Sequence, residues 1–265
     1  MNYGSHLATG GVLAAMRRMD VIANNLSNST TTGYKPDFVI ARERPAERVE
    51  GRSPFADPTA PPQEVLEKLG GGLRFEHDRI DLRDGPVERT GNQTDLALRG
   101  DGFFVLETKG GTRGRRNAPV EVTRSGATTV DKDGTLRSAD NGRAYLAENG
   151  RPLVIDPTLD FLVDGAGRVY QEGEEVARLR VVRPTNPTSL EKVGGNVLRI
   201  NGQSERVPET DFSVQQMALE ESAADPVESM VELSRQARLM EANLRMIQYQ
   251  DNLTGQAISG FSRTA

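Results

Sequence analysis

Few side chains in this sequence stand at spacings that could carry out chemistry. The two histidines, His6 and His77, could each ligate a metal, but neither has a second His at ligand spacing, and Cys is absent. The run Asp131-Lys132-Asp133-Gly134 resembles the start of a calcium loop, yet no glutamate follows where such a loop closes. We therefore predict a hairpin turn at this run and no metal ion or cofactor.

Two glycine-rich runs and two acidic pairs also lack the partners that a reaction would need. Gly100-Asp101-Gly102 and Gly70-Gly71-Gly72 extend to neither the dinucleotide fingerprint nor the phosphate loop, so turns explain them. The pairs Glu174-Glu175 and Glu220-Glu221 lie in polar sequence, where solvated charge is expected. We predict that the protein is not an enzyme and has no small-molecule substrate.

Composition removes further classes of function. The 265 residues carry 33 basic and 38 acidic side chains, a net charge of -5, which gives no basic face for nucleic acid. Without Cys there are no disulfides, and the N-terminus lacks the charged start and continuous apolar core of a cleaved signal peptide. No stretch approaches a membrane span. We expect a folded protein that stays in the cytoplasm or is exported without a cleaved signal.

The elements that organise the chain are apolar seams at its two ends. Their residues follow alternating spacings of four and three, which is typical of a narrow coiled-coil seam. We expect a helix from about Ser5 to Asn28 and another beginning at Asp225-Pro226-Val227-Glu228, where an N-cap acceptor precedes proline. The seam residues are Val12, Met16, Met19, Ala23 and Leu26, then Met230, Leu233, Ala237, Met240, Leu244 and Ile247.

Between the helices the sequence predicts a connector and then an antiparallel β domain. Prolines and the glycine triplet make residues 42–72 an extended connector, with a short helix at Gln63 to Leu69 as an option. Strand signals separated by turn residues follow. They are strongest at Phe103 to Leu106, Val120 to Thr123, Leu153 to Ile155, Phe161 to Val163 and Ala177 to Val181.

The predicted fold class is therefore α+β, with a discontinuous coiled-coil domain from both ends and a central antiparallel β domain. The predicted boundaries are 1–35 for the N-terminal helical segment, 36–71 for the connector, 72–212 for the β domain and 213–265 for the C-terminal helical segment. Spacing alone leaves two interpretations open. Either the two helices pair with each other within one chain, as a hairpin covering one side of the β domain, or their seams pair with copies of other chains.

One motif closes the first helix: Ala23, Asn24, Asn25, Leu26, Ser27, Asn28, a spacer ending at Thr32, then Gly33, Tyr34 and Lys35. It resembles the N-terminal signature of bacterial flagellar basal-body rod and hook proteins, with Ser27 where alanine is usual. Further stretches resemble the same family in order: Thr90 to Leu98 running into Gly100 to Val105, Thr123 to Gly126, Val130 to Leu136, Asp225 to Glu228, and Met240 to Asn243, where Met240 replaces tyrosine.

This resemblance implies a structural subunit of the flagellar rod, the axial drive shaft for motility. Its partners would be copies of itself, other rod and hook axial proteins, and the flagellar type III export apparatus that carries it to the basal body across the periplasm. The helices would pack against neighbouring subunits in a helical assembly, head to tail. A hook-type axial protein is the first alternative, disfavoured because the chain holds one β domain. A stalked β binding module is the second.

The motif leads to two predictions about single residues. Asparagine disfavours helix interiors, so Asn24, Asn25 and Asn28 should end the helix and contact backbone groups of adjacent subunits. Gly33 should supply a positive φ just beyond the helix. Because the isolated helices are marginal, both ends should be disordered in the monomer and should order on assembly.

Overall fold

The computed structural model describes residues 3–43, 73–76, 78–108 and 119–262. His77 and the possible helix at Gln63 to Leu69 lie outside the described residues, as does the side chain of His6. The chain divides into two units. The first, called the helical unit here, holds Met1–Leu26, Asp37–Arg79 and Pro226–Ala265, and the second, called the β unit, holds Ser27–Pro36 and Ile80–Asp225.

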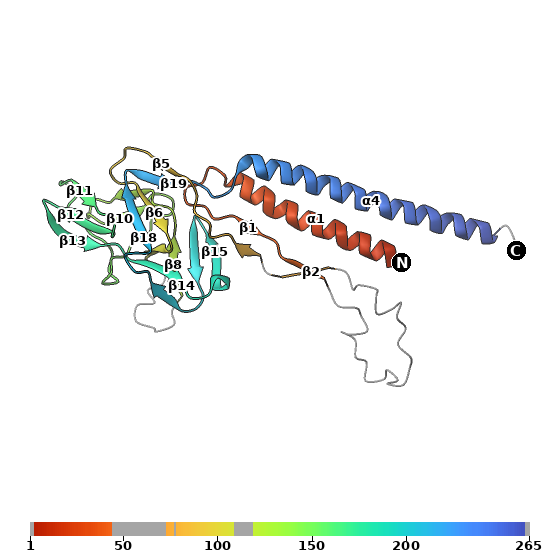
Figure 1. Cartoon of the computed structure of the whole chain (residues 1–265), viewed down its shortest axis with the longest axis horizontal. Coiled ribbons are helices and arrows are strands. Elements are labelled where there is room, and N and C mark those ends of the chain that lie inside the picture. The colour runs from red at the N-terminus through yellow and green to blue at the C-terminus, as the bar shows by residue number, and fades with distance from the viewer. Residues whose placement is uncertain (1–2, 44–72, 77, 109–118, 263–265) are drawn as a thin grey trace, which may run out of the picture. The chain divides into compact units, whose positions relative to one another are not determined.

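Two long helices dominate the helical unit (Figure 1). Helix α1 spans Tyr3–Ser27, close to the predicted bounds, and α4 spans Pro226–Ser262. Proline at the first helical position fits the start of α4, because that position has no backbone N–H to offer the helix. Its 37 residues reach about 55 Å. In the described part of the chain, no helix is long and apolar enough to cross a membrane.

Short strands accompany the helices. They are β1 (Asp37–Phe38), β2 (Ala41–Glu43) and β3 (Leu73–Phe75), with β4 (Arg79–Ile80) at the boundary between the units. β2 and β3 pair antiparallel, with Arg42 opposite Arg74. The predicted connector 36–71 therefore begins as strand rather than as irregular chain, since β1 and β2 both lie within it.

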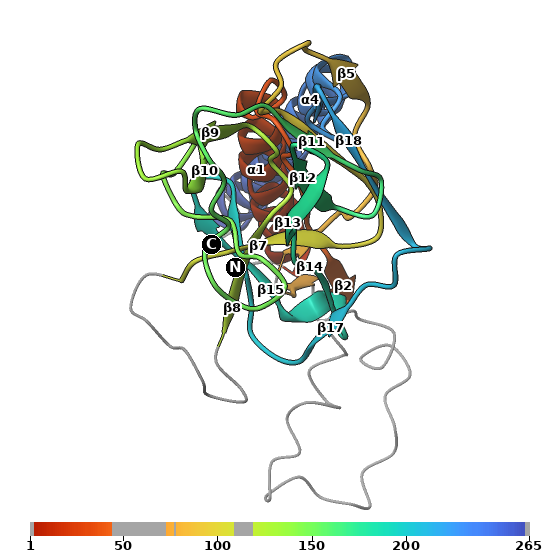
Figure 2. The same ribbon diagram turned by 90° about the vertical axis from the view of Figure 1, so that its left-hand side faces the viewer.

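The β unit is built from antiparallel strands, as predicted. Its largest sheet has the order β15-β16-β8-β7-β14-β17, and a three-stranded sheet β11-β12-β13 lies beside β18 (Figure 2). The strands are β5 (Val87–Arg89), β6 (Leu96–Gly100), β7 (Phe103–Leu106), β8 (Val120–Thr123), β9 (Thr128–Val130), β10 (Leu136–Ser138), β11 (Phe161–Val163), β12 (Arg168–Gln171), β13 (Glu174–Arg178), β14 (Val181–Pro184), β15 (Leu190–Gly194), β16 (Val197–Ile200), β17 (Ser204–Arg206), β18 (Phe212–Gln216) and β19 (Ala218–Glu220), with a 3-10 turn at Pro187–Ser189.

The core of the β unit consists of two apolar clusters. The larger contains Phe104 and Tyr145, whose rings meet edge to face with centroids 5.8 Å apart. The smaller is formed around Phe103, Val122 and Ile200. Neighbouring residues of β7 therefore serve different clusters, which follows from the alternation of side chains along a strand.

Most predicted strands are present, and two differ. Strands β7, β8 and β11 have the predicted bounds. Leu153 to Ile155 form no regular strand, and Val154 makes only an isolated bridge to Thr135. The predicted strand at Ala177 to Val181 is divided between β13 and β14, because Leu179 leaves the three-stranded sheet and bridges to Ala147. Burial still alternates across this join, which is the signal that the sequence carried.

The predicted turn at Asp131 to Gly134 is confirmed. It joins β9 to β10, Gly134 N donates to Asp131 O at 2.9 Å, and Gly134 has φ 76°. The α+β class is confirmed as well. The domain boundaries differ from the predicted ones. β18 and β19 keep the β unit running to Asp225 instead of 212, it resumes at Ile80 instead of 72, and Ser27–Pro36 belongs to it.

Candidate assembly surface

Within the helical unit, α1 presents a face of very small residues, which we call the inner face. Gly4, Ala8, Gly11 and Ala15 follow spacings of four, three and four, and both alanines are buried. A methyl group on Gly11 would lie 2.8 Å from Oδ1 of Asn243, and one on Gly4 would collide with Gln250. The two helices therefore run antiparallel and approach closely there, because no side chain on α1 keeps them apart.

The opposing positions of α4 form an inner stripe that alternates apolar and polar residues. They are Ser229, Leu233, Gln236, Met240, Asn243, Ile247 and Gln250, each buried or half-buried while most positions between them are exposed. Gln236 is only 3% exposed, and its Nε2 donates to Glu232 Oε1 at 2.7 Å. Among the described residues, Oε1 of Gln236 and of Gln250 are buried without a hydrogen-bond partner. A buried amide oxygen in this state weakens the pairing of the helices.

The predicted seam is split between this stripe and the outside. Leu233, Met240 and Ile247 belong to the inner stripe. Met16, Met230 and Leu244 are exposed by 49%, 57% and 41%. Ala23 is also exposed, and Val12, Met19, Leu26 and Ala237 are half-buried. The seam predicted on α1 thus lies one residue away from the inner face. The sequence pattern missed the inner face because glycine and alanine, which carry little apolar signal, are the residues of α1 that approach α4.

A second apolar face of α4, called the outer face here, lies about 130° around the helix from the inner stripe. Its most exposed members are Val227, Val231, Met246, Tyr249 and Leu253. A shallow groove of about 570 Å³ runs beside Met230, Val231 and Leu239 and is flanked by Arg235 and Arg238. Arg235 and Arg238 interrupt this face between Val231 and Met246, so it forms two exposed apolar patches on α4. Exposed apolar patches are typical of protein contact sites.

The motif that closes α1 divides its residues between the two units. Asn25 is buried, and its amide pairs with the backbone of Asp37: Nδ2 donates to Asp37 O at 2.7 Å, and Asp37 N donates to Oδ1 at 3.0 Å. Asn25 thus has its partner within the chain, while a contact of Asn24 and Asn28 with adjacent subunits stays a prediction. Thr31 N donates to Asn28 O at 3.1 Å and begins the turn beyond the helix.

The rest of the motif is packed into the β unit. Gly33 has φ 64°, which confirms the predicted positive φ, and a Cβ there would lie 2.5 Å from Ser125 N. Tyr34 is buried, with the Lys192 ammonium 4.0 Å from the centroid of its ring. Asn196 Nδ2 donates to Thr32 O at 2.6 Å. This segment is therefore a fitted part of the β unit.

Lys35 ends the motif in a buried ionic cluster. Its Nζ donates to Arg83 O at 2.6 Å and to Glu220 Oε1 at 2.8 Å, and Glu220 Oε2 accepts from Arg124 Nε at 2.6 Å. The three charged side chains are 1–3% exposed. Asp84 supplies the second carboxylate, 2.7 Å from Arg124 Nη2. Burial lowers the pKa of Lys35, and the carboxylate of Glu220 opposes that shift.

The remaining motifs also make internal contacts. In the stretch from Thr90 to Leu98, the Asp95 carboxylate accepts from Thr90 Oγ1 at 2.7 Å and from Asn92 Nδ2 at 3.1 Å. Arg124, in the stretch from Thr123 to Gly126, donates to the carbonyl oxygens of Gly102, Leu98 and Gly100. These motifs fix turns and hold strands together.

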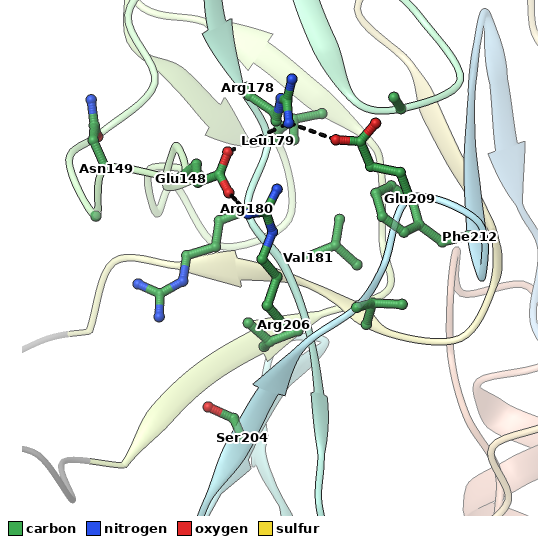
Figure 3. A pocket seen from close by; sticks show the side chains of 14 residues that line it. Glu148, Asn149, Arg178, Leu179, Arg180, Val181, Ser204, Arg206, Glu209 and Phe212 are labelled. Atoms are coloured by element: carbon green, nitrogen blue, oxygen red, sulfur yellow. Dashed lines mark hydrogen bonds and ion pairs between the residues drawn. The ribbon is translucent and has the colours of Figure 1, made fainter.

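A surface depression of the β unit, about 280 Å³, lies at the join of β13 and β14 (Figure 3). The Arg178 guanidinium lies between two carboxylates, 2.6 Å from Glu209 and 3.8 Å from Glu148, and Arg206 also pairs with Glu148. The carboxylates here are thus neutralised by neighbouring arginines. Such partly exposed pairs contribute about 0–1 kcal/mol each to stability.

Comparison with known proteins gives a consistent family. The family described as "Flagella basal body rod protein" matches residues 7–35. Flagellar basal-body rod protein FlgF of Caulobacter vibrioides is 29% identical over 246 residues, covering 91% of each chain. FlgF of Escherichia coli is 24% identical and covers 97% of each chain, and FlgG of Borreliella burgdorferi is 24% identical and covers 94% of each. The chain is therefore similar to flagellar basal-body rod proteins over most of its length.

The match to the family model ends at Lys35, the residue that enters the buried cluster. Relatives named FlgF and FlgG match at similar identity, so the comparisons support the rod family and not one rod position.

Sequence reasoning missed Glu220 and left Arg124 without a role. Glu220 was expected to be a solvated charge, and that was wrong, because it is 1% exposed and ion-paired, whereas Glu174, Glu175 and Glu221 are exposed. One signal was available. Ala218, Glu220, Ser222 and Ala224 are buried, whereas the residues between them are half-buried or exposed. A charge at a buried strand position requires a partner, and the motif residue Lys35 supplies it.

Proposed function

We propose that this chain is a structural subunit of the bacterial flagellar basal-body rod and polymerises through its terminal helices into the axial drive shaft. The observation that carries the proposal is the outer face of α4. α1 approaches the inner stripe, yet Val231 and Tyr249 remain more than 60% exposed on a helix of 37 residues. Leaving such a surface in water is costly, and packing against a neighbouring subunit removes that cost.

The proposal includes coiled-coil packing of α1 against α4 within each subunit. The four and three spacings of the inner face and the inner stripe support it, as does the close approach at Gly11. In this arrangement the small residues of α1 serve the intrachain pair. The larger exposed side chains, among them Met16 and Met230, are left for contacts between subunits.

The proposed assembly is head to tail. In such an assembly the outer face meets a different patch of the neighbouring subunit, and heterologous contacts of this kind extend into filaments when rotation does not close them. The proposed partners are copies of this chain and other axial proteins of rod and hook. The similarity to flagellar basal-body rod proteins supports delivery to the basal body by the flagellar type III export apparatus.

Motility of a deletion strain carrying variants of the outer face tests the proposal. Val231→Glu and Tyr249→Glu each place a charge on the face that we assign to subunit contact, and we expect loss of swimming and of complete rods in electron micrographs. Gln248→Glu adds the same charge at an exposed polar position beside this face and should swim normally. Normal rods in both outer-face variants would refute a contact through this face.

A further inference from the structure

The segment after α1 and the segment before α4 are held to each other on the β unit. Gly33 N donates to Glu220 O at 2.7 Å, and Ala223 N donates to Tyr34 O at 3.0 Å. Two backbone bonds thus join Gly33–Tyr34 to Glu220–Ala223. The chain continues from one side of this pair into α1, which ends at Ser27, and from the other into α4, which begins at Pro226.

The ionic cluster lies under this backbone pair and draws on four separate parts of the chain. Lys35 comes from the docked segment, Glu220 from β19, Arg124 from the residue after β8, and Arg83–Gly85 from the chain leading to β5. Gly85 N also donates to Glu220 Oε1 at 2.9 Å. Two cations face two carboxylates, counting Asp84, so every charge in the cluster has an opposite partner.

We infer that Lys35, Arg124 and Glu220 are positioning residues that keep Ser27–Pro36 docked on the β unit in the free subunit, so that the roots of α1 and α4 are fixed before assembly. Because removing one member leaves a buried charge with fewer partners, the cluster opposes undocking. The inference sharpens the expectation that the ends are disordered in the monomer. The isolated helices are only marginally stable, so we expect the ordered part of the free subunit to end where α1 ends and where α4 begins.

The consequence for helix pairing follows from loop closure. With Ser27–Pro36 released, α1 is tethered through about nine residues up to β1, which pairs with β4 where the chain returns to the β unit, whereas docking at Thr32–Gly33 shortens this tether to about four residues. A loop about half as long favours closure about threefold, because the free-energy cost of closure rises as three-halves of RT times the logarithm of loop length. The cluster thus raises the effective concentration of α1 at α4 without touching either inner surface.

The effective concentration can be measured in the purified full-length chain, which has no cysteine of its own. Cysteines replacing Gly11 and Asn243, which face each other in the helical unit, form a disulfide whose equilibrium in a glutathione redox buffer reports how often the helices meet. Lys35→Glu places a second carboxylate against Glu220 and should undock the segment, whereas Lys35→Arg keeps the charge.

A matched control is Lys132→Glu, which makes the same charge change in an exposed turn of the β unit. We expect Lys35→Glu to lower the effective concentration about threefold. Lys35→Arg should largely restore it, and Lys132→Glu should leave it unchanged. Amide exchange at Gly33 reports docking in the same samples, because its N–H is bonded to Glu220 O.

Two results would overturn the inference. Fast amide exchange at Gly33 in Lys35→Glu, with an unchanged effective concentration, would show that docking does not fix the starting points of the two helices. Retained amide protection at Gly33 in Lys35→Glu would show that the ionic cluster does not hold Ser27–Pro36 on the β unit. If Lys35→Glu unfolds the β unit, Asn196→Gly decides by the same comparison, since it removes the bond to Thr32 O at a position with φ 61° that glycine tolerates. These measurements use the free subunit, so they can fail independently of the proposed rod function.

Discussion

Replacing Gly33 with alanine probes how tightly Ser27–Pro36 fits the β unit. The added Cβ would meet only backbone atoms: it would lie 2.5 Å from Ser125 N, 2.6 Å from Arg124 C and 2.8 Å from Arg124 O. Backbone of a packed strand end cannot rotate away as a flexible side chain can. The φ of 64° adds a second cost, because only glycine adopts it freely.

The size of the effect follows from these two costs. A left-handed backbone conformation costs an alanine about 1 kcal/mol, and overpacking against a rigid neighbour adds about 2 kcal/mol. Gly91 is the matched control, because its φ is 74° and nothing lies within 4 Å of its Cβ position. Gly91→Ala should therefore lose only about 1 kcal/mol, and the two variants should differ by about 2 kcal/mol.

Thermal unfolding of the β unit, followed by near-ultraviolet circular dichroism of its tyrosines, measures this difference. For a domain of this size, about 2 kcal/mol corresponds to a separation of roughly 4–8 °C between the two melting temperatures. Equal melting temperatures for Gly33→Ala and Gly91→Ala would refute the close packing of Gly33 against Arg124–Ser125. They would also remove the steric part of the docking described above.

Three further substitutions have expected outcomes. Tyr145→Phe removes a bond to Ser125 O of 2.9 Å and should cost about 1–2 kcal/mol at pH 8. Burial also raises the pKa of Tyr145, so above about pH 10 the Tyr145 hydroxyl loses its proton in the unfolded chain and keeps it in the folded chain. The wild type should therefore lose stability more steeply with rising pH than Tyr145→Phe does. Urea midpoints of the two proteins that run parallel between pH 8 and 11 would contradict this. Asn25→Ala removes both bonds to Asp37 and should speed amide exchange at Asp37, and unchanged exchange would count against that pairing. Gln236→Leu replaces a buried unpartnered oxygen and should stabilise the helix pair by about 1 kcal/mol, seen as greater helicity at 222 nm; lower helicity would be the opposite result.

Local chemistry made the helix boundaries and turns predictable from the sequence. Pro226 marks the start of α4 because proline at a first helical position forfeits no bond, and Gly134 marks a hairpin because its φ is positive. Gly33 was predictable for the same reason. These features depend on one residue and its immediate neighbours, and they are independent of how distant segments pack.

The inner face and the buried cluster were not predictable, for a different reason. Gly4, Ala8 and Gly11 carry little hydrophobic signal, so the close approach of α1 to α4 was masked by the stronger pattern of Met16 and its neighbours. Glu220 resembles any exposed acid until Lys35 is placed beside it. Both features arise from pairs far apart in sequence, and a pattern confined to one segment contains no trace of the partner.

The hydrogen bond from Asp81 N to Pro36 O, 2.8 Å long, has a consequence for the length of chain between these two residues. The chain departs from the β unit after Pro36 and returns at Ile80, and this bond keeps the two points adjacent. The stretch between these two points is in effect an insertion into the β unit. Doubling its length would cost only about 0.6 kcal/mol in the free energy of closing the loop. A longer or shorter stretch between these two points would therefore carry little penalty for the β unit from which it departs.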